Sequence, residues 1–398
     1  MSVTQEGDVK RPILAVAAVL GSLSLTVAPS RAAAGQGQTL ADLFKTGTVR
    51  FVPEMTITDE AMAGKAFFSQ ISDIAMDDKG NLYAADSKEN NIKMFDRSGA
   101  FLGTIGRAGQ GPGEFNYPIE IEFSKGRLYV RELFNSRVSI LDDKGIYLNS
   151  VRIERQAGQW WNMLALPDGR FVVQREVTDF QDPNAPQEVF IDLFSSELAF
   201  MKTLYRHVVR RNKYISEPVR TNVPVPFAAQ VYCDVTSDGR VLIAYSGGYE
   251  VEVHDPDKGK VASFTQSYTP AEVTAEDKEL YFKGMVSSLS GPSGTVVKKQ
   301  GAPDYIINNT EFPRTKPPFL NIKSDLEGNV WVQLYGPTIT KDGPEMDVFD
   351  RQGRYCARVR IQPGGVFPYR MVPVPGGFWT IRYNEEGEVD LVRFRVSR

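Results

Sequence analysis

Short apolar runs alternate with tight-turn sequences along most of the chain, most clearly between Ile71 and Phe115. This stretch contains the runs IAM, LYAA, IKMF and FLGTI, separated by turn sequences such as DDKGN and DRSGA. Runs of this length with period-two alternation, bounded by Gly, Asn and Asp, are typical of strands joined by hairpins. Four antiparallel strands in about 45 residues form the unit of a β-propeller blade.

The four-strand unit recurs, which predicts an all-β, six-bladed β-propeller. The predicted blades cover residues 71–115, 118–154, 160–205, 229–268, 319–361 and 368–398. The last blade has only three strands, and a strand predicted at Thr48–Ile57 has no partner of its own. We therefore expect this strand to close the sixth blade as its outer edge, where Pro53 would be tolerated. A separate N-terminal extension is the alternative.

The connections differ greatly in length. In an up-and-down blade, the connections after the second and fourth strands emerge on one face, and the others emerge on the opposite face. All the long segments belong to the first set: 106–117, 176–187, 206–226, 269–318 and 335–345. Because loops on a rigid scaffold commonly carry binding residues, we expect the ligand on this face.

The longest connection, residues 269–318, is a predicted insertion between the fourth and fifth blades. It begins with a predicted helix, since Thr269 or Thr274 can cap the segment EVTAEDKELYFKGMVSSL. The insertion could cover the central channel as a lid or brace the rim, and the sequence leaves both open. The predicted propeller domain spans residues 48–398.

The N-terminus has the pattern of a signal peptide over residues 1–34, followed by a linker over 35–47. Lys10 and Arg11 precede an apolar run over residues 12–28, and Ala32-Ala33-Ala34 fits a cleavage pattern. We expect export to the periplasm or the outside of the cell, with no membrane span after processing. A single membrane anchor is the alternative, although the apolar run is short for spanning.

Balanced charge indicates no nucleic-acid partner. The chain has 46 Lys and Arg against 49 Asp and Glu, a net charge of -3, without the basic excess of such proteins. We expect a monomer. Cys233 and Cys356 are predicted on distant strands, so two free thiols are favoured over a disulfide.

Two segments, NNIKMFDRSGAFLGTIGRAGQGPGEF and FNSRVSILDDKG, resemble NHL-type repeats of bacterial six-bladed propellers. Asn91-Ile92-Lys93 and Asn135-Ser136-Arg137 match the Asn-x-Arg/Lys element that precedes an Asp-x-x-Gly turn in those repeats. Residues 109–115 match their inter-blade linker. The resemblance is strong over residues 71–154 and implies the fold; it implies little about function, since propellers host binding proteins, hydrolases and lyases.

Aromatic and basic side chains are the candidate ligand-binding groups on the face with long connections. Aromatic rings can stack on sugars or anchor a protein, and arginines attract anionic groups. Packing between blades and a solvated charged loop over residues 206–220 are the alternatives. The candidates are Tyr117, Trp160, Trp161, Arg206, Arg210, Arg211, Tyr335 and Tyr383.

Oxygen-bearing side chains at the ends of the innermost strands could hold Ca²⁺ in the channel. The candidate ligands are Asp73, Glu120, Asn162 and Asn321, a set comparable to that of secreted propeller lactonases. Gln230 and Arg370 are expected at equivalent positions, and Arg370 would repel a cation. No other cofactor is expected. With only His207 and His254 present, a catalytic triad or a histidine-ligated zinc is hard to assemble.

These observations favour an exported propeller that acts as a binding or scaffolding module for a protein or glycan. The alternative is a Ca²⁺-dependent hydrolase or lyase, similar to the lactonases, with its site at the channel mouth. Catalysis is thus left open, with a non-enzymatic role favoured.

Overall fold

The computed structural model describes residues 48–397 except 155–157, 179–185, 210–211, 216–220, 285, 291–295, 337–343, 363–369 and 384–387. The predicted signal peptide and linker lie outside the described residues. None of the described helices is both long and apolar enough to cross a membrane.

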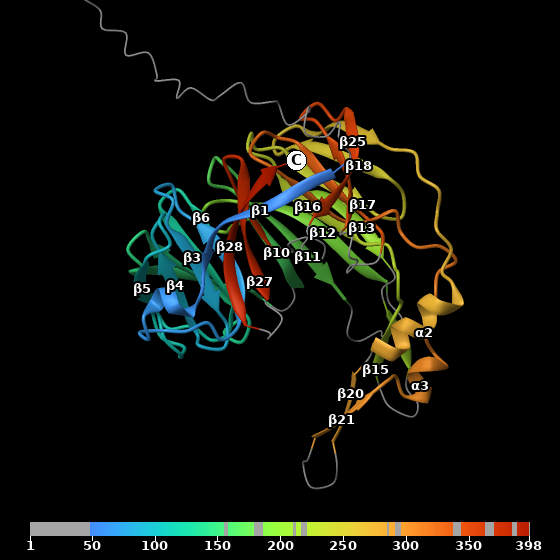
Figure 1. Cartoon of the computed structure of the whole chain (residues 1–398), viewed down its shortest axis with the longest axis horizontal. Helices are drawn as coiled ribbons and strands as arrows, with labels where there is room; N and C mark the ends of the chain where they lie inside the picture. The colour runs from blue at the N-terminus through green and yellow to red at the C-terminus, as the bar shows by residue number, and fades with distance from the viewer. Residues whose placement is uncertain are drawn as a thin grey trace, which may run out of the picture. The chain divides into compact units, whose positions relative to one another are not determined.

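Four sheets contain four antiparallel strands each, paired in chain order (Figure 1). We call them blades one to four. Blade one has β2 (Ile71–Met76), β3 (Leu82–Asp86), β4 (Asn91–Phe95) and β5 (Phe101–Ile105). Blade two has β6 (Pro118–Ser124), β7 (Arg127–Glu132), β8 (Arg137–Asp142) and β9 (Tyr147–Arg152). Blade three has β10 (Gln159–Ala165), β11 (Phe171–Val177), β12 (Gln187–Phe194) and β13 (Phe200–Val209). Blade four has β16 (Val231–Val235), β17 (Val241–Tyr245), β18 (Glu250–Asp255) and β19 (Gly259–Thr265).

The remaining blade strands form one eight-stranded sheet, in which β1 (Thr48–Ile57) lies between two halves. We call these halves blades five and six. Blade five has β22 (Phe319–Ser324), β23 (Val330–Leu334), β24 (Glu345–Phe349) and β25 (Tyr355–Gln362). Blade six has β26 (Met371–Val374), β27 (Gly377–Tyr383) and β28 (Val389–Ser397), and β1 pairs antiparallel with β28.

The pairing of β1 differs from that of a simple edge strand. Residues Thr48–Arg50 also pair in parallel with Arg360–Gln362 of β25, so this end of β1 is covered on both sides. Pro53 lies beyond that parallel pairing and next to a register shift against β28. The missing N–H of proline is therefore accommodated at an irregular part of the ladder.

Consecutive blades are joined by buried apolar clusters, because alternate side chains of each sheet face its neighbour. The pairs that represent these clusters are Ala75 with Ile121, Tyr129 with Phe171, Ile191 with Ile243, Leu242 with Phe319, Trp331 with Phe378, and Leu391 with Ile74. The last pair joins blade six to blade one. Each fully buried Ile, Leu or Phe side chain among them contributes roughly 1.5–3 kcal/mol to the stability of the fold. The all-β, propeller-like fold predicted from the sequence is confirmed.

The two segments that resemble NHL repeats contain buried ion pairs. Lys93 Nζ lies 2.7 Å from Asp86 Oδ2, and both side chains are almost completely buried. Arg137 donates to Glu132 and to the backbone carbonyl oxygens of Gln110, Gly111 and Glu114. In blade two, the Arg of the motif therefore fixes the connector between blades one and two.

The insertion between β19 and β22 contains α2 (Ala275–Gly284), the strands β20 (Val286–Ser290) and β21 (Val296–Gln300), and the short helix α3 (Asp304–Ile307). A second hairpin, β14 (Asn212–Ile215) with β15 (Thr221–Pro224), lies between β13 and β16. Thr274, one of the two caps expected from the sequence, accepts a hydrogen bond from Asp277 N and donates to the Asp277 carboxylate. This reciprocal pair begins α2, none of whose residues is buried.

The base of the insertion is a narrow neck. Val273 N donates to Arg314 O at 3.0 Å, and Lys316 N donates to Ala271 O at 2.8 Å. The two chain directions therefore enter and leave the insertion side by side, with an antiparallel bridge between Glu272 and Thr315. Along the chain, residues 274–313 lie between the two sides of this neck.

Candidate binding face and central channel

Three long connections meet at one aromatic cluster. Phe227 lies in the connection from blade three to blade four, Tyr281 and Phe312 belong to the insertion, and Tyr335 follows β23. The Phe227 ring centroid is 5.9 Å from that of Tyr335, 6.4 Å from that of Tyr281 and 6.1 Å from that of Phe312. We call the side on which these residues lie the insertion-bearing face.

Charged groups surround this cluster. Lys316 Nζ lies 5.6 Å from the Tyr335 ring centroid and 2.6 Å from Asp277 Oδ1. The Lys316 ammonium holds the pKa of Asp277 at about 2, with help from hydrogen bonds donated by Thr274. Burial raises the pKa of Tyr335 to about 12, and the Asp277 carboxylate adds to that shift. Tyr335 is therefore a neutral hydrogen-bonding phenol at physiological pH.

A groove of about 440 Å³ lies beside the neck of the insertion. Its walls combine aromatic rings, prolines and charged groups, a composition that suits extended polar ligands with apolar parts. The residues that define it are Tyr268, Lys316, Pro317, Tyr335, Glu345 and Arg358. Tyr335 is the predicted ligand-binding residue that the structure brings to both the groove and the aromatic cluster.

The two tryptophans of β10 have opposite environments. Trp160 is 5% exposed, and its ring lies 5.1 Å from that of Phe194 in the cluster between blades two and three. Trp161 is 49% exposed, because the register against β11 shifts between Trp160 and Asn162 and leaves Trp161 as the extra residue of a bulge. Trp161 thus has the exposure that a stacking residue needs, whereas Trp160 packs between blades.

Two further aromatic predictions lie on other blades of the same face. Tyr383 ends β27 and is 59% exposed. The Tyr117 hydroxyl donates to Gln70 Oε1 at 3.3 Å, and its ring lies 5.2 Å from that of Phe134, which is 65% exposed. Among the described residues, no ring contact joins any two of Tyr117, Trp161 and Tyr383.

The predicted basic loop is shorter than expected. Arg206 and His207 belong to β13, which pairs with β12 as far as Val209, so the prediction that they lie in a loop was wrong. The long β12 continues the ladder beyond the expected end. Arg206 forms an ion pair with Glu188, and its guanidinium lies 5.6 Å from the Phe190 ring centroid. Arg210 and Arg211 lie outside the described residues.

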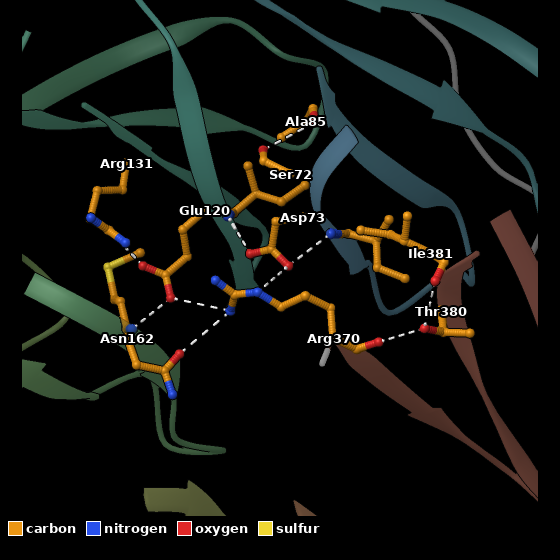
Figure 2. Close-up of polar contacts among 12 residues, drawn as sticks. Ser72, Asp73, Ala85, Glu120, Arg131, Asn162, Arg370, Thr380 and Ile381 are labelled. Atoms are coloured by element: carbon orange, nitrogen blue, oxygen red, sulfur yellow. Dashed lines mark hydrogen bonds and ion pairs between the residues drawn. The ribbon is translucent and has the colours of Figure 1, made fainter. Parts of the chain in front are cut away.

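The polar residues predicted at the channel do come together, around Arg370 (Figure 2). Arg370 Nε lies 3.4 Å from Asp73 Oδ1, and Arg370 Nη1 lies 3.5 Å from both Glu120 Oε1 and Asn162 Oδ1. On the other side of Glu120, Arg131 donates to Oε2 at 2.6 Å. The guanidinium of blade six therefore links side chains of blades one, two and three.

The carboxylates of this cluster also join neighbouring blades through the backbone. Asp73 Oδ2 accepts a hydrogen bond from Ile121 N, and Glu120 Oε1 accepts one from Met163 N. Register shifts immediately before Asp73 and Glu120 place them at these positions. The same shift precedes Asn162 and Asn321. Both carboxylates therefore have a structural role, whatever else they bind.

One channel position was assigned to the wrong residue. Gln230 precedes β16 and is exposed. Tyr232 pairs with Ala244 at the ladder step where Asp73 pairs with Ala85 in blade one. Counted back from the hairpin that ends each first strand, the residue of blade four aligned with Asp73 is Tyr232, two positions later than the sequence pattern indicated. β16 also lacks the register shift found in β2, β6, β10 and β22.

Arg370 decides how well this cluster suits Ca²⁺. Burial raises the pKa of Asp73 to about 6; Arg370 opposes that rise, and Glu120 adds to it. A guanidinium in contact with Asp73, Glu120 and Asn162 occupies the position that a cation would need, while Asn321 Oδ1 accepts from Ile322 N. These residues do not fit a Ca²⁺ site in this arrangement.

Three charged residues of the channel were not predicted. Glu122, Asp234 and Lys323 line the channel below the Arg370 cluster, each two residues beyond Glu120, Tyr232 and Asn321. Because side chains on one side of a strand recur with period two, the sequence contained a signal for them once the first positions were known. Lys323 Nζ lies 3.4 Å from Asp234 Oδ1.

The cysteines and histidines lie in separate surroundings. Cys233 is buried and Cys356 is half-buried, and both are free thiols. His254 lies 2.7 Å from Glu252 through Nε2, and the His207 ring lies 3.9 Å from that of Tyr245. Among the described residues, three or more His, Cys, Asp or Glu side chains do not gather in a way that could hold a metal ion.

Comparison with known proteins supports the fold and does not extend to an activity. Residues 63–125 match the sequence model of a protein family described as a 6-bladed β-propeller. A protein from Bacteroides fragilis that is described as exported is similar in structure, with a TM-score of 0.50, 12% identity and coverage of 90% of this chain and 98% of that chain. A member of the DUF4221 family from Bacteroides vulgatus has a TM-score of 0.51 and 12% identity, covering 88% of this chain and 99% of that chain. A search of curated proteins finds no significant match.

Proposed function

We propose that the chain is an exported binding or scaffolding module that holds a protein or glycan partner on its insertion-bearing face. The observation that carries this proposal is the convergence of three long connections on the cluster of Phe227, Tyr281, Phe312 and Tyr335. A rigid ring that gathers its variable segments at one place has the organisation of a recognition surface.

The side chains exposed on this face support the same function. Trp161, Tyr383 and Phe134 each expose about half of their surface or more, and Leu280 of α2 is also exposed. Aromatic side chains dominate the energetic centres of binding sites, because they bury much area at a low cost in conformational entropy. Export is proposed from the basic residues, apolar run and small residues of the N-terminus.

The competing function, a Ca²⁺-dependent hydrolase or lyase, finds less support in the channel. Its candidate ligands Asp73 and Glu120 are engaged by Arg370 and by backbone amides of the next blade. We therefore favour binding over catalysis.

The neck allows the insertion to be removed in order to test the binding function. Replacing residues 274–313 with a short Gly-Ser linker preserves the hydrogen bonds of Val273 and Lys316 across the neck. The tagged protein and this variant are each cross-linked to cell-envelope extract of the source organism, and captured material is compared. We expect the intact protein to capture a specific partner and the variant to lose it. Protease or periodate treatment of the extract shows whether that partner is protein or glycan.

Point variants supply the matched control. Trp161→Ala should weaken capture by roughly tenfold, the scale of a moderate hot spot, without changing thermal stability. Trp160→Ala should instead lower stability, because it removes a buried ring. Equal capture by the intact protein, the excised variant and Trp161→Ala would refute binding on this face.

A further inference from the structure

The central channel contains a cavity of about 470 Å³, formed by the innermost strands of all six blades. This volume is within the usual range of small-molecule sites, about 300–1,000 Å³. One end of the cavity lies at Asp73 and Arg370, and the other lies at the short turns that carry Asp78, Lys125 and Leu326. The cavity is thus approached from the face opposite the insertion.

The cluster around Arg370 narrows the inner end of the cavity. Figure 2 shows Arg370 extended from blade six toward Asp73, Glu120 and Asn162 of blades one to three. A small molecule that enters from the face that carries the short turns therefore reaches Arg370 and its partners at the inner end. The cavity is separate from the aromatic cluster of the insertion, because none of the four rings of that cluster lines it.

Four charged side chains on the cavity wall, those of Asp73, Asp234, Lys323 and Arg370, have an opposite charge beside them. Lys323 lies 3.4 Å from Asp234, whose other oxygen accepts hydrogen bonds from Ser324 N and Oγ. Arg370 lies beside Asp73 and Glu120, and Arg131 also pairs with Glu120.

Glu122 differs from these groups. It lies half-buried on the cavity wall, and within the described part of the chain its carboxyl has neither an ion pair within 4 Å nor a hydrogen bond. Burial raises its pKa well above the ordinary value, Asp73 and Glu120 raise it further, and Arg370 and Lys323 oppose the rise. A positive charge beside Glu122 would therefore allow it to ionise and would fill the missing half of an ion pair.

The rest of the wall suits the carbon skeleton of a ligand. Ala75, Leu164 and Val372 line the cavity together with Pro167 and Pro373. An amine on a short carbon chain could place its ammonium at Glu122 and its methylenes against these residues. A bare metal ion would lack the several oxygen ligands that it requires.

We propose that this channel cavity binds a small organic cation, such as a protonated alkylamine, whose charge is balanced by the Glu122 carboxylate. The charged groups that face Glu122 are Asp73, Glu120, Asp234, Lys323 and Arg370.

Three probes of similar size and different charge test this proposal: n-butylamine hydrochloride, 1-butanol and sodium butyrate. Binding to the full chain is measured at pH 7 by saturation-transfer NMR titration. We expect saturable binding of butylammonium, at least about tenfold tighter than that of butanol or butyrate, as a charge-assisted hydrogen bond provides. Absence of butylammonium binding, or butyrate binding of equal strength, would overturn the proposal.

Glu122→Gln removes the charge and keeps the shape, and it should weaken butylammonium binding by about tenfold or more. Glu60→Gln, at an exposed residue of the 3-10 helix η1 (Asp59–Met62), is the matched control and should leave binding unchanged. An unchanged affinity in Glu122→Gln would show that the cation binds elsewhere. The variant with residues 274–313 excised should still bind butylammonium, which separates this inference from the binding function of the opposite face.

Discussion

The blades and the insertion each contain a lysine–aspartate pair, and the two pairs differ in burial. In blade one, the side chains of Lys93 and Asp86 are 1% and 0% exposed, and they lie 2.7 Å apart. In the insertion, the side chains of Lys316 and Asp277 are 17% and 21% exposed at 2.6 Å. Similar distances thus occur in a dry interior and in a partly hydrated surface site.

The apolar groups differ in the same way. Phe51 and Phe378 of the sheet that joins blades five and six are buried, with ring centroids 4.7 Å apart. In contrast, α2 buries none of its residues, and its contacts to the blades pass through the aromatic cluster and the neck. We infer that folding depends on the blades, while the insertion is available to change without loss of the fold.

The largest expected effect comes from removing β1. Deleting residues 1–57 takes Val49 and Phe51 from the cluster between blades five and six, and Ile57 from the cluster between blades six and one. It also opens the edge of β28. We expect the cooperative thermal transition, measured by circular dichroism, to disappear.

Two other variants are the controls for this experiment. Deletion of residues 1–47, which ends immediately before β1, should keep the transition. Replacement of residues 274–313 should keep it as well. If the excised insertion unfolded the protein as completely as loss of β1, the proposed independence of the two regions would be wrong.

The buried pair provides the next largest effect. Lys93→Met leaves the Asp86 carboxylate inside blade one without its cation, although Ser69 N and Gln70 N still donate to it. Loss of one member of a buried pair costs roughly 3–5 kcal/mol. Urea unfolding should therefore show a decrease of that size in the free energy of unfolding.

Lys316→Met is the corresponding change in the insertion. Because both partners are partly hydrated, we expect the free energy of unfolding to decrease by at most about 1 kcal/mol. The comparison between blades and insertion would fail if the two variants lost similar stability.

The sequence was sufficient to predict the repeated strands, because period-two patterns and turn glycines are local signals. It also indicated that β1 would join the last blade, since blade six lacked a strand. The parallel contact of β1 with Arg360–Gln362 was not predictable in this way. That contact depends on how far two distant blades come together, which no local pattern contains.

The candidate site shows the same division between local and non-local information. The positions of Asp73, Glu120, Asn162 and Arg370 followed from the repeat, and these residues do meet. The opposite burial of Trp160 and Trp161 depends on a bulge in β10, which apolar alternation does not reveal. Likewise, Phe227 and Phe312 meet only through folding of the insertion.

An effect smaller than that of Lys93→Met depends on pH and concerns Arg370. In the intact protein the pKa of Asp73 is about 6, above its ordinary value of 3.8. A carboxyl whose pKa is raised by folding stabilises the fold fully below pH 3.8, and this contribution is lost as pH rises to about 6. Above that pH, Asp73 makes no further change in the intact protein.

Arg370→Met removes the cation that opposes the rise in the pKa of Asp73, so the free energy of unfolding should continue to fall above pH 6. Each additional unit of pKa corresponds to about 1.4 kcal/mol. We therefore expect the free energy of unfolding of the variant to fall by roughly 1–2 kcal/mol more than that of the intact protein between pH 6 and 8. Urea titrations at the two pH values measure this difference.

Adding Asp73→Asn to Arg370→Met should reduce the extra dependence of stability on pH. Adding Glu122→Gln as well should remove much of what remains, because Arg370 opposes the rise in pKa of both carboxyls. Parallel pH profiles for Arg370→Met and the intact protein would show that Arg370 does not control the charge of the channel.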